Sequence, residues 1–294
     1  METPGYLYEE ERIQQVVVDI TDDYEHIDAT LEYVLENVLQ ENETNSEEYK
    51  TLQYNYNTVL INRCKCSGRT TCDSKCFHGG RYIEADDGYE LVLSANQRSD
   101  IIYECSSACS CNQDTCMNRL VQKGPRKNLI IIDSPTYKSK GLATTTDIPS
   151  GGFICEYAGE LLTKHEARRR VLDNARYSKM NYVLCLNEIA QHKDGEQLKY
   201  STIVDPSHRG NIGRYLNHSC EPNCHIYSVR VDCQIPKIGI FAKQRILAGE
   251  ELCFNYADGV NYSETFKECS SQLSAVYCLC NSSKCRNFLP NVEF

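Results

Sequence analysis

Short apolar runs separated by turn residues dominate the chain from about residue 127 onward. Runs of this length, bounded by glycine, proline or aspartate, predict strands rather than helices. The expected strands are 129–132, 152–157, 182–186, 203–204, 225–231, 238–242 and 251–254. One helix interrupts them, because Thr163 and Glu166 form a capping box ahead of 167–172. The arginine run 168–170 is expected to be a solvated face of this helix rather than a nuclear address.

The N-terminal part of the chain is polar and acidic, with one stretch of helical periodicity. Residues 1–26 have no sustained pattern and are expected to be disordered. Apolar residues at the spacing of one helix face then follow at Ile27, Leu31, Val34, Leu35 and Val38. This spacing predicts an amphipathic helix over 27–40 that packs on the main body or, as the alternative, binds a partner. The polar stretch 41–48 is expected to be a linker.

Composition places the acidity in the same N-terminal part. The 294 residues are 41% hydrophobic, which supports one large domain or two small ones with a real core. The first 60 positions hold fifteen acidic and two basic residues, whereas the remainder is nearly balanced in a chain of net charge −10. That balance gives no argument for DNA binding. There is no apolar run of about 18 residues and no signal-peptide pattern, so an intracellular protein without a membrane segment is expected.

Eighteen cysteines are grouped in a way that favours metal binding over disulfides. Closely spaced C-x-C pairs cannot easily bridge to each other, but they suit tetrahedral zinc with sulfur at about 2.3 Å. A disulfide framework is the alternative, and the missing signal peptide argues against it. The groups are Cys64, Cys66, Cys72 and Cys76; Cys105, Cys109, Cys111 and Cys116; and Cys278, Cys280 and Cys285. Region 64–116 has few strand or helix signals, so metal is expected to organise it.

Two further segments carry the most specific pattern in the chain. The stretch 214–220 reads RYLNHSC, and the stretch 251–256 reads ELCFNY. Together with EYAGE at 156–160 and the cysteine groups on either side, they resemble the SET-domain protein lysine methyltransferases of the Su(var) type. The resemblance covers about 60–290. The stretches 119–124 and 210–214 are similar in particular to the branch whose SET unit is fused to a mariner transposase.

This resemblance implies a fold and a domain order. The fold would be mainly β with short helices: a SET-domain β-clip fold with a pseudoknot, flanked by zinc-organised pre-SET and post-SET modules. The expected domains are a disordered acidic segment (1–26), an amphipathic helix and linker (27–61), a pre-SET zinc module (62–124), the SET domain (125–258), a connecting segment (259–276) and a post-SET zinc module (277–294).

The resemblance also implies four zinc ions. In the family's pre-SET module nine cysteines hold three zinc ions, and this chain offers eight, with His78 where a further cysteine would stand. A neutral imidazole suits a terminal ligand position, and the alternative is that His78 is a loop histidine. The fourth zinc would be held by Cys220 together with Cys278, Cys280 and Cys285, and it would pin the C-terminal tail against the active site.

By position in the family, one set of residues binds S-adenosylmethionine as the methyl donor. Asn217 and His218 would hold its adenine end, and Arg214 and Tyr182 would line the same pocket. The family's donor loop usually reads Lys-Gly-Trp-Gly-Leu-Arg, whereas 138–143 reads KSKGLA here. Backbone contacts can survive this change, so the loop is still expected to bind the donor. Its contributing residues would be Lys138, Ser139 and Lys140.

A second set of residues would line the channel for the acceptor lysine. The acceptor must be a neutral amine, although free lysine has a pKa of about 10.4. An apolar channel beside the donor's positive charge lowers that pKa. Tyr256 and Tyr157 would orient the amine. At the position of Phe254 the family carries Phe or Tyr, and Phe leaves room for added methyl groups, so di- or trimethyl-lysine is the expected product.

The expected function is methylation of a histone tail by an S-adenosylmethionine-dependent enzyme. Lysine nine of histone H3 is favoured, because that preference accompanies a pre-SET module of this kind. A nuclear protein that acts on chromatin, with the nucleosome as a further partner, follows. The alternatives are another histone lysine such as thirty-six or four, a non-histone protein, and a module that binds peptide without turnover. A zinc protein that reads DNA sequence is disfavoured, because no basic recognition helix lies near the cysteines.

Overall fold

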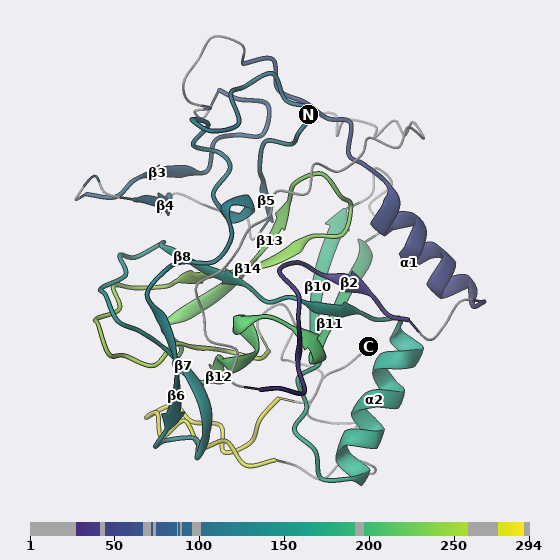
Figure 1. Ribbon diagram of the computed structural model, residues 1–294, viewed down its shortest axis with the longest axis vertical. Coiled ribbons are helices and arrows are strands. Elements are labelled where there is room, and N and C mark those ends of the chain that lie inside the picture. Colours follow the sequence, from purple (N-terminus) through teal and green to yellow (C-terminus); the bar gives the residue numbers. More distant parts are fainter. Residues whose placement is uncertain are drawn as a thin grey trace.

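The fold is mainly β, as the sequence predicts, with two α-helices among the described residues (Figure 1). The computed structural model describes residues 28–41, 45–66, 72, 75–86, 88, 90–95, 101–191, 197–257 and 276–290. The predicted disorder of 1–26 and most of the connecting segment 259–276 lie outside these residues. Within them, no helix is long and apolar enough to cross a membrane.

Two larger sheets form the body of the molecule. The first has the order β1 (Glu32–Tyr33), β11 (Gln197–Gly210), β9 (Gly159–Leu161) and β2 (Val38–Leu39), with β10 (Leu184–Gln191) also paired to β11. The second has the order β5 (Ile101–Tyr103), β13 (Cys224–Arg230), β14 (Lys237–Ala242) and β8 (Phe153–Glu156). Their apolar side chains meet in one main core, which includes the fully buried Ile154, Val204 and Ile240. Burial of each such side chain contributes about 1.5–3 kcal/mol, so this core fixes the strands that carry the site.

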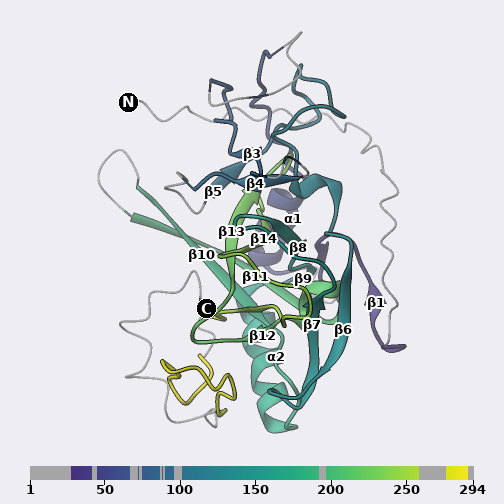
Figure 2. The same ribbon diagram turned by 90° about the vertical axis from the view of Figure 1, so that its left-hand side faces the viewer.

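Three strand pairs, two α-helices and two 3-10 turns complete the described fold. The pairs are β3 (Tyr82–Glu84) with β4 (Leu91–Leu93), β6 (Leu129–Ser134) with β7 (Ser139–Thr144), and β12 (Asn217–His218) with β15 (Cys253–Phe254). The helical elements are α1 (Glu47–Asn57), α2 (Lys164–Arg176) and the 3-10 turns η1 (Val121–Lys123) and η2 (Ile212–Tyr215). In both views the described residues between 60 and 120 lie at one end of the molecule and the C-terminal segment 276–290 lies toward the other (Figures 1 and 2).

The pairing of β12 with β15 joins the two segments that carry the most specific sequence pattern. The strands run parallel, with Asn217 opposite Cys253 and His218 opposite Phe254. The Ser219 N–H then donates to the Phe254 carbonyl at 3.0 Å. Residues more than thirty positions apart are thereby fixed side by side.

The predicted amphipathic helix over 27–40 is wrong. This segment instead contains β1 and β2, which pair in parallel with β11 and β9. The Val34 N–H donates to the Gly210 carbonyl and the Gln40 N–H to the Leu161 carbonyl, at 3.1 and 3.2 Å. An isolated helix of this length is marginal without a packed face. The sheet edges give the backbone hydrogen-bond partners, so the segment lies extended along them.

The helix of this region begins later, inside the stretch expected to be a linker. The Ser46 side chain accepts a hydrogen bond from the Tyr49 N–H at 3.1 Å and so caps α1. Glu47 and Glu48 stand in the first turn, where negative charge favours a helix. The Tyr49 side chain is buried and donates to the Gln40 carbonyl at 3.2 Å, which fastens α1 to the extended segment before it.

Most predicted strands are present, with changed lengths. β11 is much longer than the predicted 203–204, and β10 begins at Leu184 rather than at 182. Strands β7 and β9 were not predicted, because their sequences SKGLAT and GEL are rich in residues that disfavour strands. Within 64–116, which was expected to contain few regular elements, only short strands occur among the described residues.

The Thr163 half of the predicted capping box of α2 is confirmed. The Thr163 hydroxyl accepts from the Glu166 N–H at 3.2 Å, whereas the Thr163 N–H donates to Gln40 Oε1 at 2.9 Å. The arginine run of this helix is only partly solvated. Arg170 is 14% exposed and pairs with carboxylates on β9, α2 and β11. Its partners, all at 2.7–2.8 Å, are Glu160, Glu166 and Asp205. The buried carboxylates draw this guanidinium inward, so the expectation of an exposed face is wrong for Arg170.

Candidate active site and metal centres

Eight cysteines of the first two sequence groups lie together beside His78. Seven of them are at most 8% exposed, and Cys66 is half-buried. Three sets of four donor atoms occur, and within each set all atoms lie within 4.8 Å of one another. The sets are Cys64, Cys66, Cys72 and Cys76; Cys64, Cys72, Cys105 and Cys111; and Cys64, Cys76, His78 and Cys105. Several cysteines belong to more than one set. A metal cluster in which one thiolate binds two ions requires such shared ligands.

The spacing of these donors suits zinc. A tetrahedral ion with sulfur at about 2.3 Å places neighbouring donor atoms about 3.8 Å apart. The Sγ atoms of Cys64 and Cys72 are 3.9 Å apart. Cys109 and Cys116 are buried in the same cluster without belonging to one of the sets of four. The donor chemistry and the distances therefore fit the predicted zinc module.

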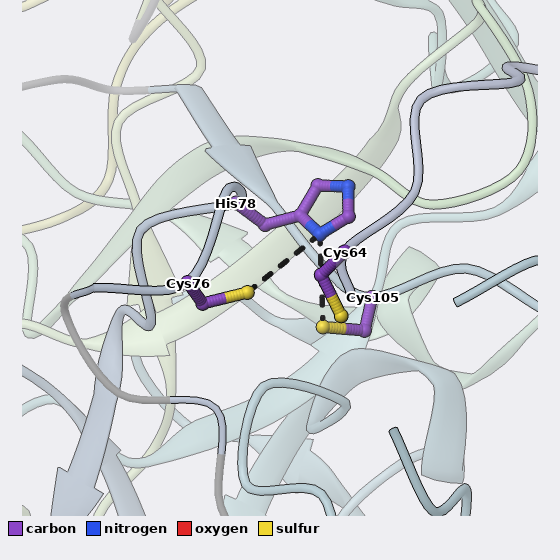
Figure 3. A group of neighbouring side chains, drawn as sticks. All are labelled: Cys64, Cys76, His78 and Cys105. Carbon is purple, nitrogen blue, oxygen red and sulfur yellow. Dashed lines mark hydrogen bonds between the residues drawn. The ribbon is translucent and has the colours of Figure 1, made fainter. Parts of the chain in front are cut away.

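His78 faces the cysteines with one ring nitrogen (Figure 3). Its Nδ1 lies 3.7 Å from Cys105 Sγ, 3.9 Å from Cys109 Sγ and 4.0 Å from Cys76 Sγ. The other nitrogen, Nε2, lies 3.3 Å from the Asn62 carbonyl oxygen. A carbonyl partner fixes the proton on Nε2 and leaves the Nδ1 lone pair for a metal, which is the usual arrangement of a histidine ligand. The geometry supports His78 as a ligand over a plain loop histidine.

The C-terminal cysteines meet Cys220, as the resemblance implies. The donor atoms of Cys220, Cys278, Cys280 and Cys285 lie within 4.8 Å of one another, and all four residues are half-buried. Cys220 Sγ is 3.9 Å from Cys278 Sγ and accepts from the Arg286 N–H at 3.4 Å. This set also fits a tetrahedral zinc. It holds the segment 276–290 against the end of β12.

A cavity of about 350 Å³ lies beside β12, within the size range of small-molecule sites. Of the predicted donor-binding residues, it brings together Ser139, Lys140, Tyr182, Arg214 and Asn217. The predicted catalytic Tyr256 also lines it. The lining residues that sequence reasoning missed are Asp28, Ala29, Met180, Asn181 and Tyr215.

Two predicted donor-binding residues do not line this cavity. Lys138 is exposed in the turn between β6 and β7, where its φ is 53°. His218 is 2% exposed, and its Nδ1 accepts from the Tyr256 N–H at 3.1 Å. Its Nε2 lies 3.4 Å from Cys220 Sγ. The His218 ring therefore connects the Tyr256 backbone to the C-terminal cysteine cluster.

Glu251 braces the altered donor loop against Asn217. Its carboxylate accepts from Asn217 Nδ2 at 2.8 Å and from the Ser134 hydroxyl at 2.7 Å. Asn217 Nδ2 also donates to the Lys140 carbonyl at 3.1 Å. A Cβ atom at Gly141 would lie 2.5 Å from Glu251 Oε1, so a larger residue there would displace the Glu251 carboxylate from Asn217. These contacts hold the KSKGLA loop in place although its sequence departs from the usual one.

Three aromatic rings meet where the predicted lysine channel ends. The Phe254 ring centroid lies 6.0 Å from that of Tyr157 and 4.9 Å from that of Tyr256. The Tyr256 hydroxyl donates to the Leu216 carbonyl at 2.9 Å, and the Tyr157 hydroxyl donates to the Tyr182 carbonyl at 2.5 Å. Burial raises the pKa of both tyrosines above their usual value. Both hydroxyls therefore stay protonated at neutral pH.

Comparison with known proteins identifies the same region. The SET domain family matches residues 139–257. The Caenorhabditis elegans protein described as probable histone-lysine N-methyltransferase set-23 is 39% identical over 230 residues, which are 77% of this chain and 86% of that protein.

Solved structures give the same result. The methyltransferase domain of human histone-lysine N-methyltransferase SETMAR superposes with a TM-score of 0.64 at 29% identity, over 90% of this chain and 91% of that one. Arabidopsis thaliana SUVH6 in complex with SAM superposes with a TM-score of 0.65 at 26% identity, over 92% of this chain and 52% of that one.

Proposed function

We propose that this chain, which belongs to the SET-domain histone-lysine N-methyltransferases, methylates lysine nine of histone H3 and yields di- or trimethyl-lysine. S-adenosylmethionine is the methyl donor of this class of enzyme, and it supplies an electrophilic methyl group. One observation carries the proposal. Tyr256 lines the cavity beside β12, called the donor cavity from here on, while its ring packs on Phe254, so the cavity and the three aromatic rings share a wall. A methyl group and an amine can therefore meet at Tyr256.

The channel tyrosines suit an orienting role. Because Tyr256 and Tyr157 donate their protons to main-chain carbonyls, their oxygen lone pairs remain to accept from the N–H groups of an amine. Their raised pKa excludes them as general bases at neutral pH. The acceptor lysine must lose its proton before transfer, and the apolar rings favour the neutral amine by desolvation. Fixing the amine in line with the methyl group then lowers the barrier.

The proposed degree of methylation rests on Phe254. Its ring is 1% exposed and lies between the two tyrosines. A phenyl ring has no hydroxyl that would hold a water molecule in the channel. The space of that water is then available to methyl groups already on the amine, which supports a product beyond monomethyl-lysine.

The proposed substrate and location rest on the family. The relatives are named for histone-lysine methylation, which supports a histone substrate and a place in nuclear chromatin. The buried cysteine cluster supports a pre-SET module of the kind that accompanies preference for lysine nine. The alternative substrates are another histone lysine and a non-histone protein.

The substrate test uses the whole chain, radiolabelled donor and a panel of histones and nucleosomes. We expect label on histone H3, and its loss when lysine nine of an H3 tail peptide is replaced by arginine. Tyr256→Phe removes the orienting oxygen and should lower the rate about 100-fold with unchanged folding. Label on a different histone, or on the arginine peptide at the same rate, would contradict the proposed substrate.

The product test is mass spectrometry of the peptide during turnover. The unmutated chain should give di- or trimethyl-lysine. Phe254→Tyr restores the hydroxyl and should shift the product toward monomethyl-lysine. Monomethyl-lysine as the sole product of the unmutated chain would overturn this part of the proposal.

A further inference from the structure

The donor cavity is completed by residues that precede the SET-matched segment by more than a hundred positions. Asp28 and Ala29 line it together with Arg214, Tyr182 and Tyr215. The family match begins at residue 139, so this part of the wall lies outside the matched residues. The wall comes from the extended segment 28–41, called the strap here.

The strap is fixed to the sheet directly after Asp28. Glu32 of β1 lies opposite Arg209 of β11, and their side chains pair at 3.1 Å. The same guanidinium reaches Glu41 at 3.3 Å, near the other end of the strap. The backbone pairing of β1 with β11 holds Asp28 in the cavity wall, whereas these exposed ion pairs contribute little to it.

The Asp28 carboxylate is hydrogen-bonded and charged. Its Oδ1 accepts from the Thr30 N–H at 3.0 Å and from the Thr30 hydroxyl at 2.6 Å. These hydrogen bonds lower the pKa of Asp28 below its usual value. Its Oδ2 lies 3.4 Å from Arg214 Nη1, and the side chain is 38% exposed.

Arg214 is held in the cavity wall by several contacts besides Asp28. Its side chain is 6% exposed, and its guanidinium carbon lies 4.5 Å from the centroid of the Tyr182 ring. Its Nε donates to the Pro206 carbonyl at 3.1 Å. The Asp28 carboxylate is the charged partner that this buried cation has among the described residues. An unpaired buried charge would be costly.

The charges of the lining match those of the methyl donor. Among the described residues, the cavity is lined by two cationic side chains, Lys140 and Arg214, and by one carboxylate, that of Asp28. S-adenosylmethionine carries one carboxylate, one ammonium group and one sulfonium. Cations alone would repel its two positive groups, whereas a carboxylate offsets that repulsion.

We infer that Asp28 is a donor-binding residue, whose carboxylate favours the positively charged groups of S-adenosylmethionine and holds Arg214 in the cavity wall. The inference rests on the proposed function in one respect, that the methyl donor occupies this cavity. It makes the strap part of the donor site.

The test is calorimetric titration of the whole chain with S-adenosylmethionine and, separately, with the neutral product S-adenosylhomocysteine. Asp28→Asn keeps a side-chain acceptor for Thr30 but removes the charge. We expect it to weaken donor binding about tenfold and product binding less, because the product lacks the sulfonium charge.

Two matched variants separate the charge from the fold of the strap. Glu32→Gln removes another strap carboxylate that does not line the cavity, and Thr30→Val removes the hydroxyl hydrogen bond but leaves the Asp28 charge. Both should keep the donor affinity within about threefold of the unmutated chain. Thermal unfolding without ligand checks that all variants fold.

The outcomes of this test distinguish the inference from the proposed function. Equal donor affinity in Asp28→Asn and the unmutated chain would overturn the inference alone. A parallel loss for donor and product, matched by Glu32→Gln, would overturn it too, because it would reveal a purely structural strap. An unmutated chain that binds no donor would overturn both claims.

Discussion

The two cysteine clusters have the same donor chemistry but different surroundings. The cluster of the segment 64–116 is almost fully buried and lies beyond β5, where its ligands replace an apolar core. The C-terminal cluster is half-buried, and its Cys220 follows His218, whose ring holds the Tyr256 backbone. The spacing of the cysteines therefore does not by itself reveal the role of a metal site. One cluster maintains the fold, and the other fastens a segment to the active site.

The burial of the first cluster predicts the largest effect on stability. Cys64 belongs to all three sets of four donors, so Cys64→Ser removes a ligand that the zinc sites share. We expect a loss of about 4 kcal/mol in the free energy of unfolding, or no folded protein. Circular dichroism during thermal unfolding and metal analysis measure it. The matched control is Cys233→Ser, outside both clusters, and equal stability of the two variants would contradict this role.

The C-terminal cluster should behave in the opposite way. Cys278→Ser would release the segment 276–290 from Cys220 and loosen the wall at Tyr256. A misplacement of this kind costs about 100-fold in kcat/KM. The melting temperature should change little, because the main core does not contain this cluster. A Cys278→Ser variant that unfolds as readily as Cys64→Ser, or that keeps full activity, would contradict the different roles assigned to the two clusters.

Substitution of His78 tests whether this residue is a zinc ligand of the buried cluster. His78→Ala removes the Nδ1 donor and should lose about one zinc ion per chain after dialysis against a chelator. His78→Cys restores a thiolate at the family's usual position and should retain that ion. Metal analysis by mass spectrometry checks both, and full zinc retention in the alanine variant would show that His78 is not a ligand.

The smallest expected effect concerns the link between the donor loop and Asn217. Glu251→Gln weakens the charged hydrogen bonds to Asn217 and Ser134 without removing the side chain. We expect about a tenfold rise in the Kd for the donor and an unchanged melting temperature. Equilibrium titration with the donor measures the change. Glu250→Gln, at the neighbouring exposed turn, serves as the control and should bind the donor normally.

Sequence pattern predicted the parts of the site that depend on local residue order. The resemblance assigned donor-binding and channel residues to the RYLNHSC and ELCFNY stretches, and the parallel pairing of Asn217–His218 with Cys253–Phe254 brings the two stretches together. The meeting of Cys220 with the C-terminal cysteines was likewise expected from the resemblance.

The missed parts depend on contacts that no local pattern encodes. The apolar residues of 27–38 have the spacing of one helix face, but the same sequence can also form two short strands. It does so here because β11 and β9 offer hydrogen-bond partners to its backbone. Asp28 joins the cavity only because β1 docks on β11. Glu251 meets Ser134 across 117 positions, which a reading of neighbouring residues does not reveal. The cap at Ser46, by contrast, was a visible signal for α1 that the helical spacing before it obscured.

The most direct test of the central claim is mass spectrometry of an H3 tail peptide after incubation with the unmutated chain and S-adenosylmethionine. The account predicts two or three added methyl groups, all on lysine nine, and none on a peptide that has arginine there. An unmodified peptide under conditions where the chain binds the donor, or methyl groups confined to another lysine, would contradict it.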